Sequence, residues 1–461
     1  MRCKMNLSEY KTSVLFIFLI SSIITGTSCK KWLEQKPDQS FTVPSHLTDL
    51  QAILDNPIGG ASSPGYIEMV ADNYYVLSSS WNAAHVDQRL NYIWASNAAI
   101  TSNHYVWTEP YRSVYQANFV LDLLPTITII ESEQANYSNI KGTALFYRAF
   151  SFYHLAQLFC KPYSSSAATD KGIVLKLTSA VDERYTRATV QQTYDQLIAD
   201  LKNAIELLPV TTSFATRPNK AAAYGLLARA YLSMRDYTNA GLAANASLSL
   251  NSALLDYKNL VPSNTLPQTY VNNPEVSFTS ITGVDLLSPS SHPIIDSNLY
   301  LSYSSNDLRK KVFFGDYGGG NYYWKGSYYS TADYYSTFTG IASDEIYLIR
   351  AECRARAGNK NEAMDDLNTL LRKRHDNTFI DLTATDAADA LNKILIERRK
   401  ELLFRGLRWT DLRRFNLENA NITLKRVIDG ITYTLPPNDL RWVLLIPDIE
   451  LSRSGIQQNP R

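Results

Sequence analysis

The chain has 461 residues, of which 45% are hydrophobic and 19% charged, and its formal net charge is +1. This length and composition are typical of a folded protein with one large domain, or two lobes that share a core. The near-neutral charge argues against a nucleic-acid partner, because such binding depends on a broad basic surface.

Residues 1–28 are predicted to be a lipoprotein signal peptide. Three basic residues in the first eleven positions precede an apolar run at 14–24, which is too short to span a bilayer comfortably. The small residues Gly26-Thr27-Ser28 then lead directly to Cys29. This order predicts that the Cys29 thiol is acylated and anchors the mature chain, at about 0.8 kcal/mol per buried methylene. Ordinary cleavage that leaves a free thiol is the alternative.

The rest of the chain is expected to lie outside the bilayer, since no later segment reaches the roughly 18 apolar residues of a span. Two further cysteines remain in the mature chain, Cys160 and Cys353. Both fall in expected helices, where cysteine is usually a small buried apolar residue. A disulfide between them is left open by the sequence.

Two irregular stretches interrupt the helical pattern, which begins near 47–54 and resumes at 111–124. The first insert, residues 56–104, is rich in Gly, Ser, Asn and Tyr and has poor periodicity. The second insert, residues 261–340, contains five prolines, and its alternating polar and aromatic residues at 321–330 predict a short strand pair. Long loops in compact domains are usually functional, so ligand contacts are expected in these inserts.

From residue 141 onward the pattern predicts about four degenerate tetratricopeptide-like helical hairpins. The clearest runs from Tyr224 to Ser247, where aromatic and small residues recur at the spacing of two antiparallel helices. The other expected hairpins are 143–158 with 193–209, 347–370 around a turn at Gly358, and 387–404 with 407–414. The fold is therefore predicted to be mainly α, with long irregular loop inserts and a few short strands.

Enzyme signatures are mostly absent from the chain. It contains no H-E-x-x-H, C-x-x-C, G-x-S-x-G or G-x-x-x-x-G-K motif. Its six histidines lack metal-ligand spacing, so no metal and no cofactor are expected, and His154 is expected in the core. Asp365 and Asp366 are predicted to lie on a solvated helix face. A glycoside hydrolase stays open as an alternative, because its two carboxylates can come from distant positions.

The densest charged segment is residues 397–414, which read ERRKELLFRGLRWTDLRR. Glu397 and Glu401 lie four residues apart on one helix face, and Arg408 and Asp411 lie three apart within reach of each other. Because charges of both signs alternate, the segment predicts a buried ion-pair network that fixes the last hairpin to the scaffold. A phosphate or nucleic-acid site is the alternative.

This segment resembles the E-R-x-x-E-L-x-F-E-G-x-R-W-x-D-L-x-R signature of the SusD/RagB family of outer-membrane nutrient-binding lipoproteins. The chain departs from that pattern at Arg405, where the family usually has an acidic residue, and at Lys30 and Lys31 after the lipidated cysteine. Four other segments match family motifs in family order: Cys29 with Trp32-Leu33 and Pro37, Tyr147–Leu155, Asp344–Glu352, and Leu445–Pro447 with Gln457–Pro460.

The resemblance implies a SusD-like α-rich fold with an N-terminal region at 29–250 and a C-terminal RagB/SusD region at 251–461. It implies a surface-exposed lipoprotein of the outer membrane that catalyses nothing. Such a protein captures a nutrient, foremost an oligosaccharide, and delivers it to a SusC-like TonB-dependent transporter. A peptide ligand and a tetratricopeptide-type interaction scaffold in the periplasm are the alternatives.

Ligand contacts are predicted for insert aromatics that no helix pair needs. These are Tyr74, Tyr75 and Trp81, with Asn82 beside the tryptophan, and Tyr300 and Tyr303. Flat rings stack on sugar C–H surfaces, and an amide binds hydroxyl groups. The family places aromatics in comparable loops, which favours Trp81; the alternative is that its ring fills a gap under its own loop.

Overall fold

The computed structural model describes residues 44–56, 65–101, 105–182, 185–260, 273–283, 286, 291–326 and 336–461. The signal segment, the predicted lipidation site Cys29 and parts of both inserts lie outside these residues. Residues His46–Arg461 form one compact unit.

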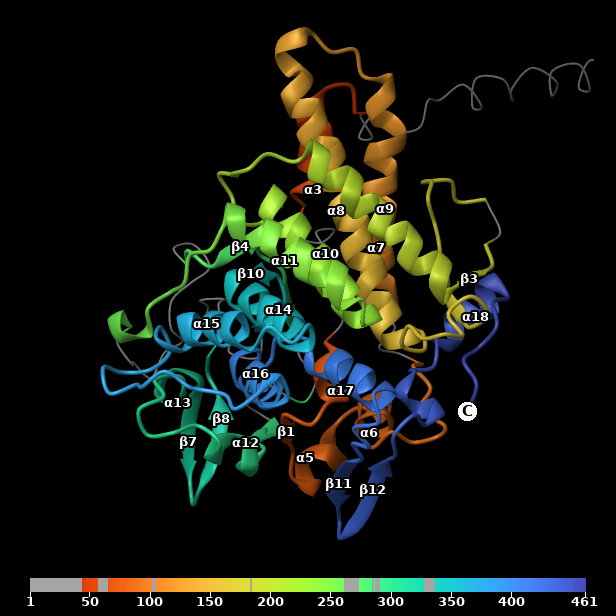
Figure 1. Cartoon of the computed structure of the whole chain (residues 1–461). Coiled ribbons are helices and arrows are strands. Elements are labelled where there is room, and N and C mark those ends of the chain that lie inside the picture. The colour runs from red at the N-terminus through yellow and green to blue at the C-terminus, as the bar shows by residue number, and fades with distance from the viewer. Residues whose placement is uncertain are drawn as a thin grey trace, which may run out of the picture. The chain divides into compact units, whose positions relative to one another are not determined.

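Helices dominate this unit (Figure 1). They are α3 (Leu47–Leu54), α4 (Tyr66–Met69), α5 (Ser78–Ala83), α6 (Val86–Tyr92), α7 (Tyr105–Leu123), α8 (Gln134–Phe159), α9 (Val190–Leu207), α10 (Lys220–Met234), α11 (Tyr237–Leu250), α12 (Ser297–Leu301), α13 (Arg309–Phe313), α14 (Ser343–Arg356), α15 (Lys360–Leu371), α16 (Ala387–Glu401), α17 (Arg408–Leu417) and α18 (Asp448–Ser454).

The strands of the described residues are short and pair as two-stranded antiparallel ribbons. The pairs are β1 (Tyr74–Tyr75) with β6 (Ile294–Ile295), β2 (Lys171–Val174) with β3 (Arg187–Thr189), β4 (Val276–Phe278) with β10 (Ile341–Ala342), β5 (Ile281–Gly283) with β9 (Ser336–Phe338), β7 (Phe314–Gly318) with β8 (Asn321–Trp324), and β11 (Leu424–Ile428) with β12 (Ile431–Leu435). The prediction of a mainly α fold with a few short strands is confirmed.

Three of the expected helix pairs pack as predicted: α8 with α9, α10 with α11, and α14 with α15. The fourth differs, because α16 packs chiefly against α14 while α17 packs against α10 and α4. Helix α11 also packs against α14, so the described unit is continuous across position 250. Whether these pairs follow tetratricopeptide geometry stays a prediction.

Helix α8 lies between α7 and α9 and is buried along most of its length. Its C-terminal half is buried on all sides, which is typical of a helix inside a core. Thr189 is the N-cap of α9, and its hydroxyl accepts from the Gln192 backbone N–H in a capping box. In α10, Gly225 allows the Ile341 side chain of β10 to pack close to the helix backbone, since a Cβ at position 225 would lie 2.5 Å from that side chain.

The first insert contains more regular structure than its sequence predicts, namely α4, α5, α6 and β1. Each of these elements has seven residues or fewer, too few to give a periodic signal. In the second insert, β7 and β8 pair across a turn at Gly318–Gly320. Strand β8 lies within the predicted segment 321–330, but its partner β7 precedes that segment, so only one strand of the predicted pair is confirmed there. Residues 327–330 of the predicted pair lie outside the described residues.

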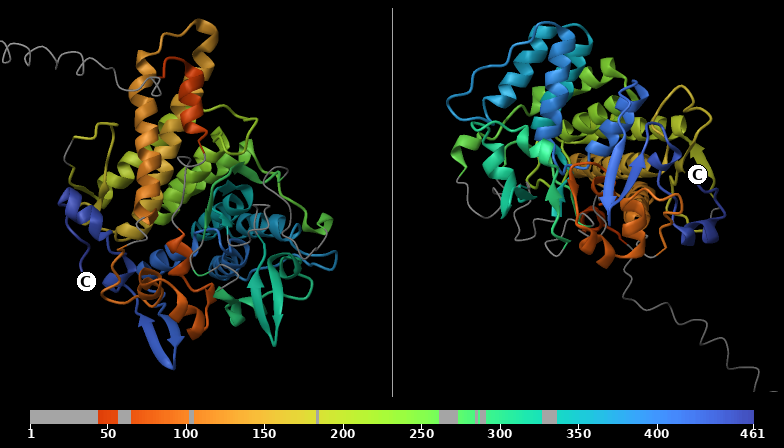
Figure 2. Two further views of the ribbon diagram at one scale, coloured as in Figure 1. Left: turned by 180° about the vertical axis from the view of Figure 1, so that it is seen from behind. Right: turned by 90° about the horizontal axis from the view of Figure 1, so that it is seen from below.

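Elements of both inserts meet at one end of this unit. Strand β1 of the first insert pairs with β6 of the second, directly before α12. Figures 1 and 2 show β1, α5, α12, the β7–β8 ribbon and the β11–β12 ribbon at the lower end, away from the α7–α8 pair. The β11–β12 ribbon was not predicted from the sequence.

Candidate ligand site

A cavity of about 590 Å³ lies where the two inserts meet. Residues after α4, residues of β1, Asp296 and Asn298 at the start of α12, Arg399 of α16 and residues 422–427 line it. We call it the β1–α12 cavity. Its volume lies in the range of small-ligand sites.

Strand β1 presents its two tyrosines to opposite sides. Tyr74 pairs with Ile295 and Tyr75 with Ile294, and successive strand residues face opposite ways. Tyr75 is 37% exposed, whereas Tyr74 is 1% exposed and packs against Phe404. Tyr75 can therefore offer a ring to a ligand, whereas Tyr74 borders the same cavity but is packed into the core, and its ligand contact stays a prediction.

The two tyrosines of the second insert also differ. Tyr300 of α12 is half-buried, and its ring stacks on Tyr322 of β8 with 3.5 Å between centroids. Tyr303 is 1% exposed, and its hydroxyl donates to the Lys400 carbonyl at 2.7 Å. Tyr303 is thus a core residue, and its predicted ligand contact is wrong, because the turn after α12 directs it inward.

Trp81 and Asn82 lie on α5, beside the β11–β12 ribbon. The Trp81 indole N–H donates to the Arg89 carbonyl at 3.0 Å, and the Arg89 guanidinium lies 5.4 Å from the ring centroid. The ring is half-buried, so Trp81 at least partly fills the space under its own loop. The exposed Asn82 amide donates to Asp429 in the ribbon turn at 3.2 Å.

Two guanidiniums hold the Asp72 carboxylate, which lines the cavity together with Arg399. Arg408 donates to both oxygens of Asp72, at 2.7 and 2.9 Å, and Arg399 lies 3.4 Å from Asp72 and 3.8 Å from Asp296. Burial would raise the pKa of Asp72, but Arg408 and Arg399 outweigh it and hold that pKa well below its usual range. Asp72 can therefore accept hydrogen bonds from hydroxyls, but it cannot serve as the protonated acid of a glycosidase.

The Arg408 pairing corrects the sequence prediction. Arg408 was expected to reach Asp411, three residues along its helix, but its partner is Asp72. Asp411 instead accepts from Arg398 and Arg414, at 2.9 Å each. The Arg408–Asp72 pair fastens the first insert to α17, which places the signature segment directly behind the β1–α12 cavity.

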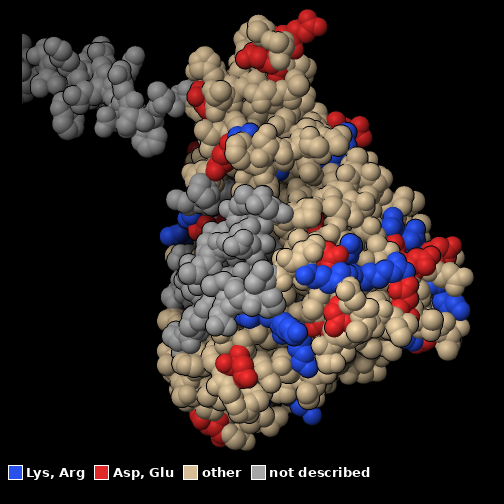
Figure 3. Space-filling view, turned by 90° about the vertical axis from the view of Figure 1, so that its left-hand side faces the viewer, with Lys and Arg blue, Asp and Glu red and all other residues tan. Residues whose placement is uncertain are grey.

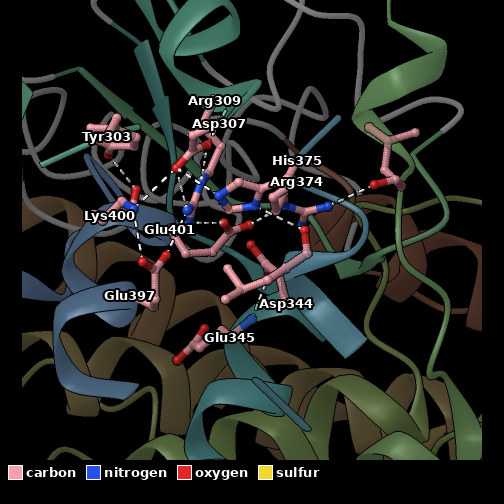
Figure 4. Close-up of polar contacts among 12 residues, drawn as sticks. Tyr303, Asp307, Arg309, Asp344, Glu345, Arg374, His375, Glu397, Lys400 and Glu401 are labelled. Atoms are coloured by element: carbon pink, nitrogen blue, oxygen red, sulfur yellow. Dashed lines mark hydrogen bonds and ion pairs between the residues drawn. The ribbon is translucent and has the colours of Figure 1, made fainter. Parts of the chain in front are cut away.

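Glu397, Lys400 and Glu401 of the signature segment join a buried charge network, as predicted (Figure 4). Arg309 has 0% exposure and donates to Asp307 at 2.7 and 2.9 Å, to Glu397 at 2.6 Å and to Glu401 at 2.9 Å. Arg374 extends the network, since its guanidinium donates to the Glu401 carboxylate at 2.6 Å. Each carboxylate of this network thus has a cationic partner, which offsets its desolvation.

Asp366 differs from the expectation, and the two further cysteines of the mature chain settle an open point. Asp366 is buried, not solvated, because Arg350 and Arg354 of the neighbouring helix both donate to it. Cys160 and Cys353 are both buried free thiols, so they form no disulfide. Burial raises the pKa of each thiol, to about 11 and about 12. Both are therefore weak nucleophiles.

On the face shown in Figure 3, acidic and basic side chains are intermixed over the described surface. Within the described ranges, no group of three or more His, Cys, Asp or Glu side chains could hold a metal ion. No helix in the same ranges has the length and apolar character needed to cross a membrane.

Comparison with known proteins identifies the family. A family model described as "Starch-binding associating with outer membrane" matches residues 31–232, and the model of the SusD family matches residues 344–443. The chain belongs to the SusD/RagB family. A SusD-like protein P2 from Formosa agariphila is 29% identical over 153 residues, which are 33% of this chain and 28% of that protein. The match therefore spans under a third of that relative.

Solved structures share the SusD/RagB fold. A SusD superfamily protein from Bacteroides thetaiotaomicron superposes with a TM-score of 0.73 at 22% identity, covering 90% of this chain and 100% of the other. A SusD-like carbohydrate binding protein from Bacteroides vulgatus superposes with a TM-score of 0.66 at 18% identity, covering 89% and 97%. At these identities the likeness shows the fold.

In this SusD/RagB protein, the structure gathers Tyr75, Trp81, Asn82 and Tyr300 at one end of the described unit. Tyr75 lines the cavity itself, while the other three flank it on α5 and α12. Sequence reasoning missed Asp72 and Arg399. No local pattern could reveal them, since Asp72 lies 336 residues from its partner Arg408.

Proposed function

We propose that this SusD/RagB protein captures an oligosaccharide nutrient at the β1–α12 cavity and catalyses nothing. The observation that carries this proposal is the exposed Tyr75 ring beside the ionised Asp72 and Arg399 in one cavity. A flat ring stacks on a sugar face, while a carboxylate and a guanidinium bind hydroxyls. The family description and the carbohydrate-binding structural relative support a sugar over a peptide, which is the alternative ligand.

Other residues around the cavity would extend the contact surface. Tyr300 presents the edge of a stacked tyrosine pair, and Asn82 presents an exposed amide. Trp81 stays in the proposed site together with its contacts to Arg89, so its loss would affect both binding and local packing. Asp72 has no free proton to give, which supports binding over hydrolysis.

The Tyr75→Ala variant tests the proposed site. We expect it to weaken oligosaccharide binding by about 1–3 kcal/mol, or about 5- to 150-fold, the scale known for stacking on aromatic platforms in another ligand class. Isothermal titration of a panel of glycans and peptides first identifies the ligand class, and the variant is then titrated with whichever ligand binds.

Tyr115→Ala is the matched control, because Tyr115 of α7 is 40% exposed and lies outside the cavity lining. Both variants should melt at nearly the wild-type temperature, since neither ring is in the core. Undiminished affinity in Tyr75→Ala, or an equal loss in both variants, would remove the β1–α12 cavity from the proposal.

We further propose that Cys29 carries the lipid anchor and that the protein faces the cell exterior, where it passes its ligand to a SusC-like TonB-dependent transporter. Family membership and the outer-membrane description of the matching model support this. In membrane fractionation, Cys29→Ser should appear in the soluble fraction. Mild-detergent extraction of the wild type should also recover a β-barrel partner.

Cys160→Ser serves as the control, since that thiol is buried and should not affect sedimentation. If intact Cys29→Ser protein still sediments with membranes, the anchor assignment fails. If the wild type repeatedly emerges without a partner, the transporter assignment fails independently of the anchor.

A further inference from the structure

A second pocket, of about 410 Å³, lies apart from the β1–α12 cavity and shares no lining residue with it. The loop 161–171 after α8, the end of α17, and residues of the segment 438–460 line it. We call it the α17 pocket. The proposed oligosaccharide site uses none of these residues, although Arg413 lies within the signature segment and Asn459-Pro460 belong to the closing motif.

Arg413 is the buried cation in the wall of this pocket. The residue is 3% exposed, and its guanidinium donates to the backbone carbonyls of Gln157 and Cys160, while its Nε has no hydrogen-bond partner. The next residue, Arg414, pairs with Glu352 and Asp411. No carboxylate of the described residues pairs with Arg413, and burial lowers its pKa to about 10.

The two carboxylates that line the α17 pocket are already neutralised. Asp170 accepts from Lys161 at 2.7 Å, and Asp439 accepts from Arg441 at 2.8 Å. Lys171, an exposed residue of the lining, takes part in no ion pair among the described residues. Arg413 and Lys171 therefore leave the pocket with a positive charge that its own residues do not balance. A buried cation without a counterion is costly, so an anion is favoured there.

The remaining wall is mostly apolar. Pro162, Leu417, Leu440 and Trp442 contribute to it. Trp442 is held in place, since its indole N–H donates to the Pro436 carbonyl at 2.7 Å and its ring lies 4.5 Å from that of Trp409. Such a wall can contact the apolar body of a ligand.

We propose that the α17 pocket is a second ligand site, which binds a small organic carboxylate with an apolar body. The carboxylate lies against Arg413 and Lys171, and the apolar part lies against Trp442 and its neighbours. The shared chemistry fits both a free aromatic acid and the C-terminal residue of a peptide.

Isothermal titration with N-acetyl-L-phenylalanine and with its uncharged amide tests the proposal. We expect the acid to bind and the amide to bind about tenfold more weakly or worse, since hydrogen bonds to charged groups are worth more than neutral ones. The tripeptide Gly-Gly-Phe separates the two sources: it should bind at least as tightly as the acid if the pocket takes a peptide end, and more weakly if it takes a free acid.

Two variants connect binding to this pocket. Arg413→Gln should abolish the preference for acid over amide. Because Arg413 also supports two backbone carbonyls, that variant can fail to fold, so the exposed Lys171→Glu carries the test in parallel. Lys171→Glu should weaken binding of the acid severalfold, whereas Lys202→Glu, an exposed lysine of α9 outside the pocket, should not.

Tyr75→Ala should leave binding of the acid unchanged, which separates this site from the proposed oligosaccharide site. Equal affinity for acid and amide, no binding of the acid at millimolar concentration, or identical behaviour of Lys171→Glu and Lys202→Glu would overturn the assignment.

Discussion

Replacing Arg309 with methionine is expected to lower the free energy of unfolding by about 3–5 kcal/mol, the scale for breaking a buried ion pair by removing one partner. Arg309 is the common partner of Asp307, Glu397 and Glu401, all of which are buried. Without it, these charges lie close together in a low-dielectric interior. The shift of the urea denaturation midpoint, measured at pH 7, checks the prediction.

Arg372→Met is the matched control, because Arg372 also makes a two-pronged pair, with Asp381, but both side chains are about half exposed. We expect a change within about 0.5 kcal/mol there. Equal effects of the two substitutions would contradict the view that burial makes the Arg309 network important.

Lowering the pH should destabilise the protein through the same Arg309 network. Burial alone would raise the pKa values of Asp307 and Glu397, but Arg309 and Lys400 outweigh it and hold both below their usual range. The stability that these carboxylates contribute is therefore present above their unfolded pKa values and is lost as the pH falls through the folded ones.

Replacing Glu68 with glutamine is expected to stabilise the protein above neutral pH. Glu68 is fully buried and accepts hydrogen bonds from the Gly406 backbone N–H at 2.6 Å and from the Asn73 amide at 3.1 Å. Burial raises its pKa from 4.5 to about 7 despite these donors. Between these two values the folded state holds a proton that the unfolded state has lost.

The direction of this pH dependence follows from the linkage between protonation and folding. Stability from the protonated Glu68 is complete below pH 4.5 and declines as the pH rises through 7. Glutamine is neutral at every pH, so Glu68→Gln should exceed the wild type at pH 8 by up to about 3 kcal/mol and match it near pH 4. Asn73 can turn its amide to accept from the new N–H, since its Oδ1 has no partner.

Urea denaturation at pH 4, 6 and 8 measures this difference. Glu206→Gln, at an exposed position of α9, is the control and should show no comparable pH-dependent gain. A Glu68→Gln variant that is less stable than the wild type at pH 8 would show that the carboxylate is ionised and needed in the folded state.

Local patterns predicted the helical scaffold and much of its charge network. The spacing of aromatic and small residues from Tyr224 to Ser247 predicted α10 and α11, because helix packing repeats its contacts every three to four residues. The segment 397–414 predicted a buried network, because its charges of both signs recur at helical spacing. The order of five motifs, from Cys29 to the C-terminal Gln457–Pro460, predicted the family without any tertiary information.

The candidate site could be predicted only in part. The sequence indicated that both inserts carry aromatics, but it could not tell which of the two tyrosines of β1 is exposed. In a two-residue strand, pairing with Ile294 and Ile295 decides this, and it sends Tyr75 outward and Tyr74 into the core. A distant contact also decides the burial of Tyr303, because its hydroxyl donates to the Lys400 carbonyl of α16.

The sequence by itself thus determined three of the four helix pairs, the family and the insert regions, because these depend on periodicity and motif order within short windows. Only the tertiary structure decided that Arg408 pairs with Asp72, that an unbalanced Arg413 lies in a pocket wall, and that Glu68 meets Gly406. Each of these depends on groups that the chain brings together from distant positions, and pairings of that kind leave no local pattern in the sequence.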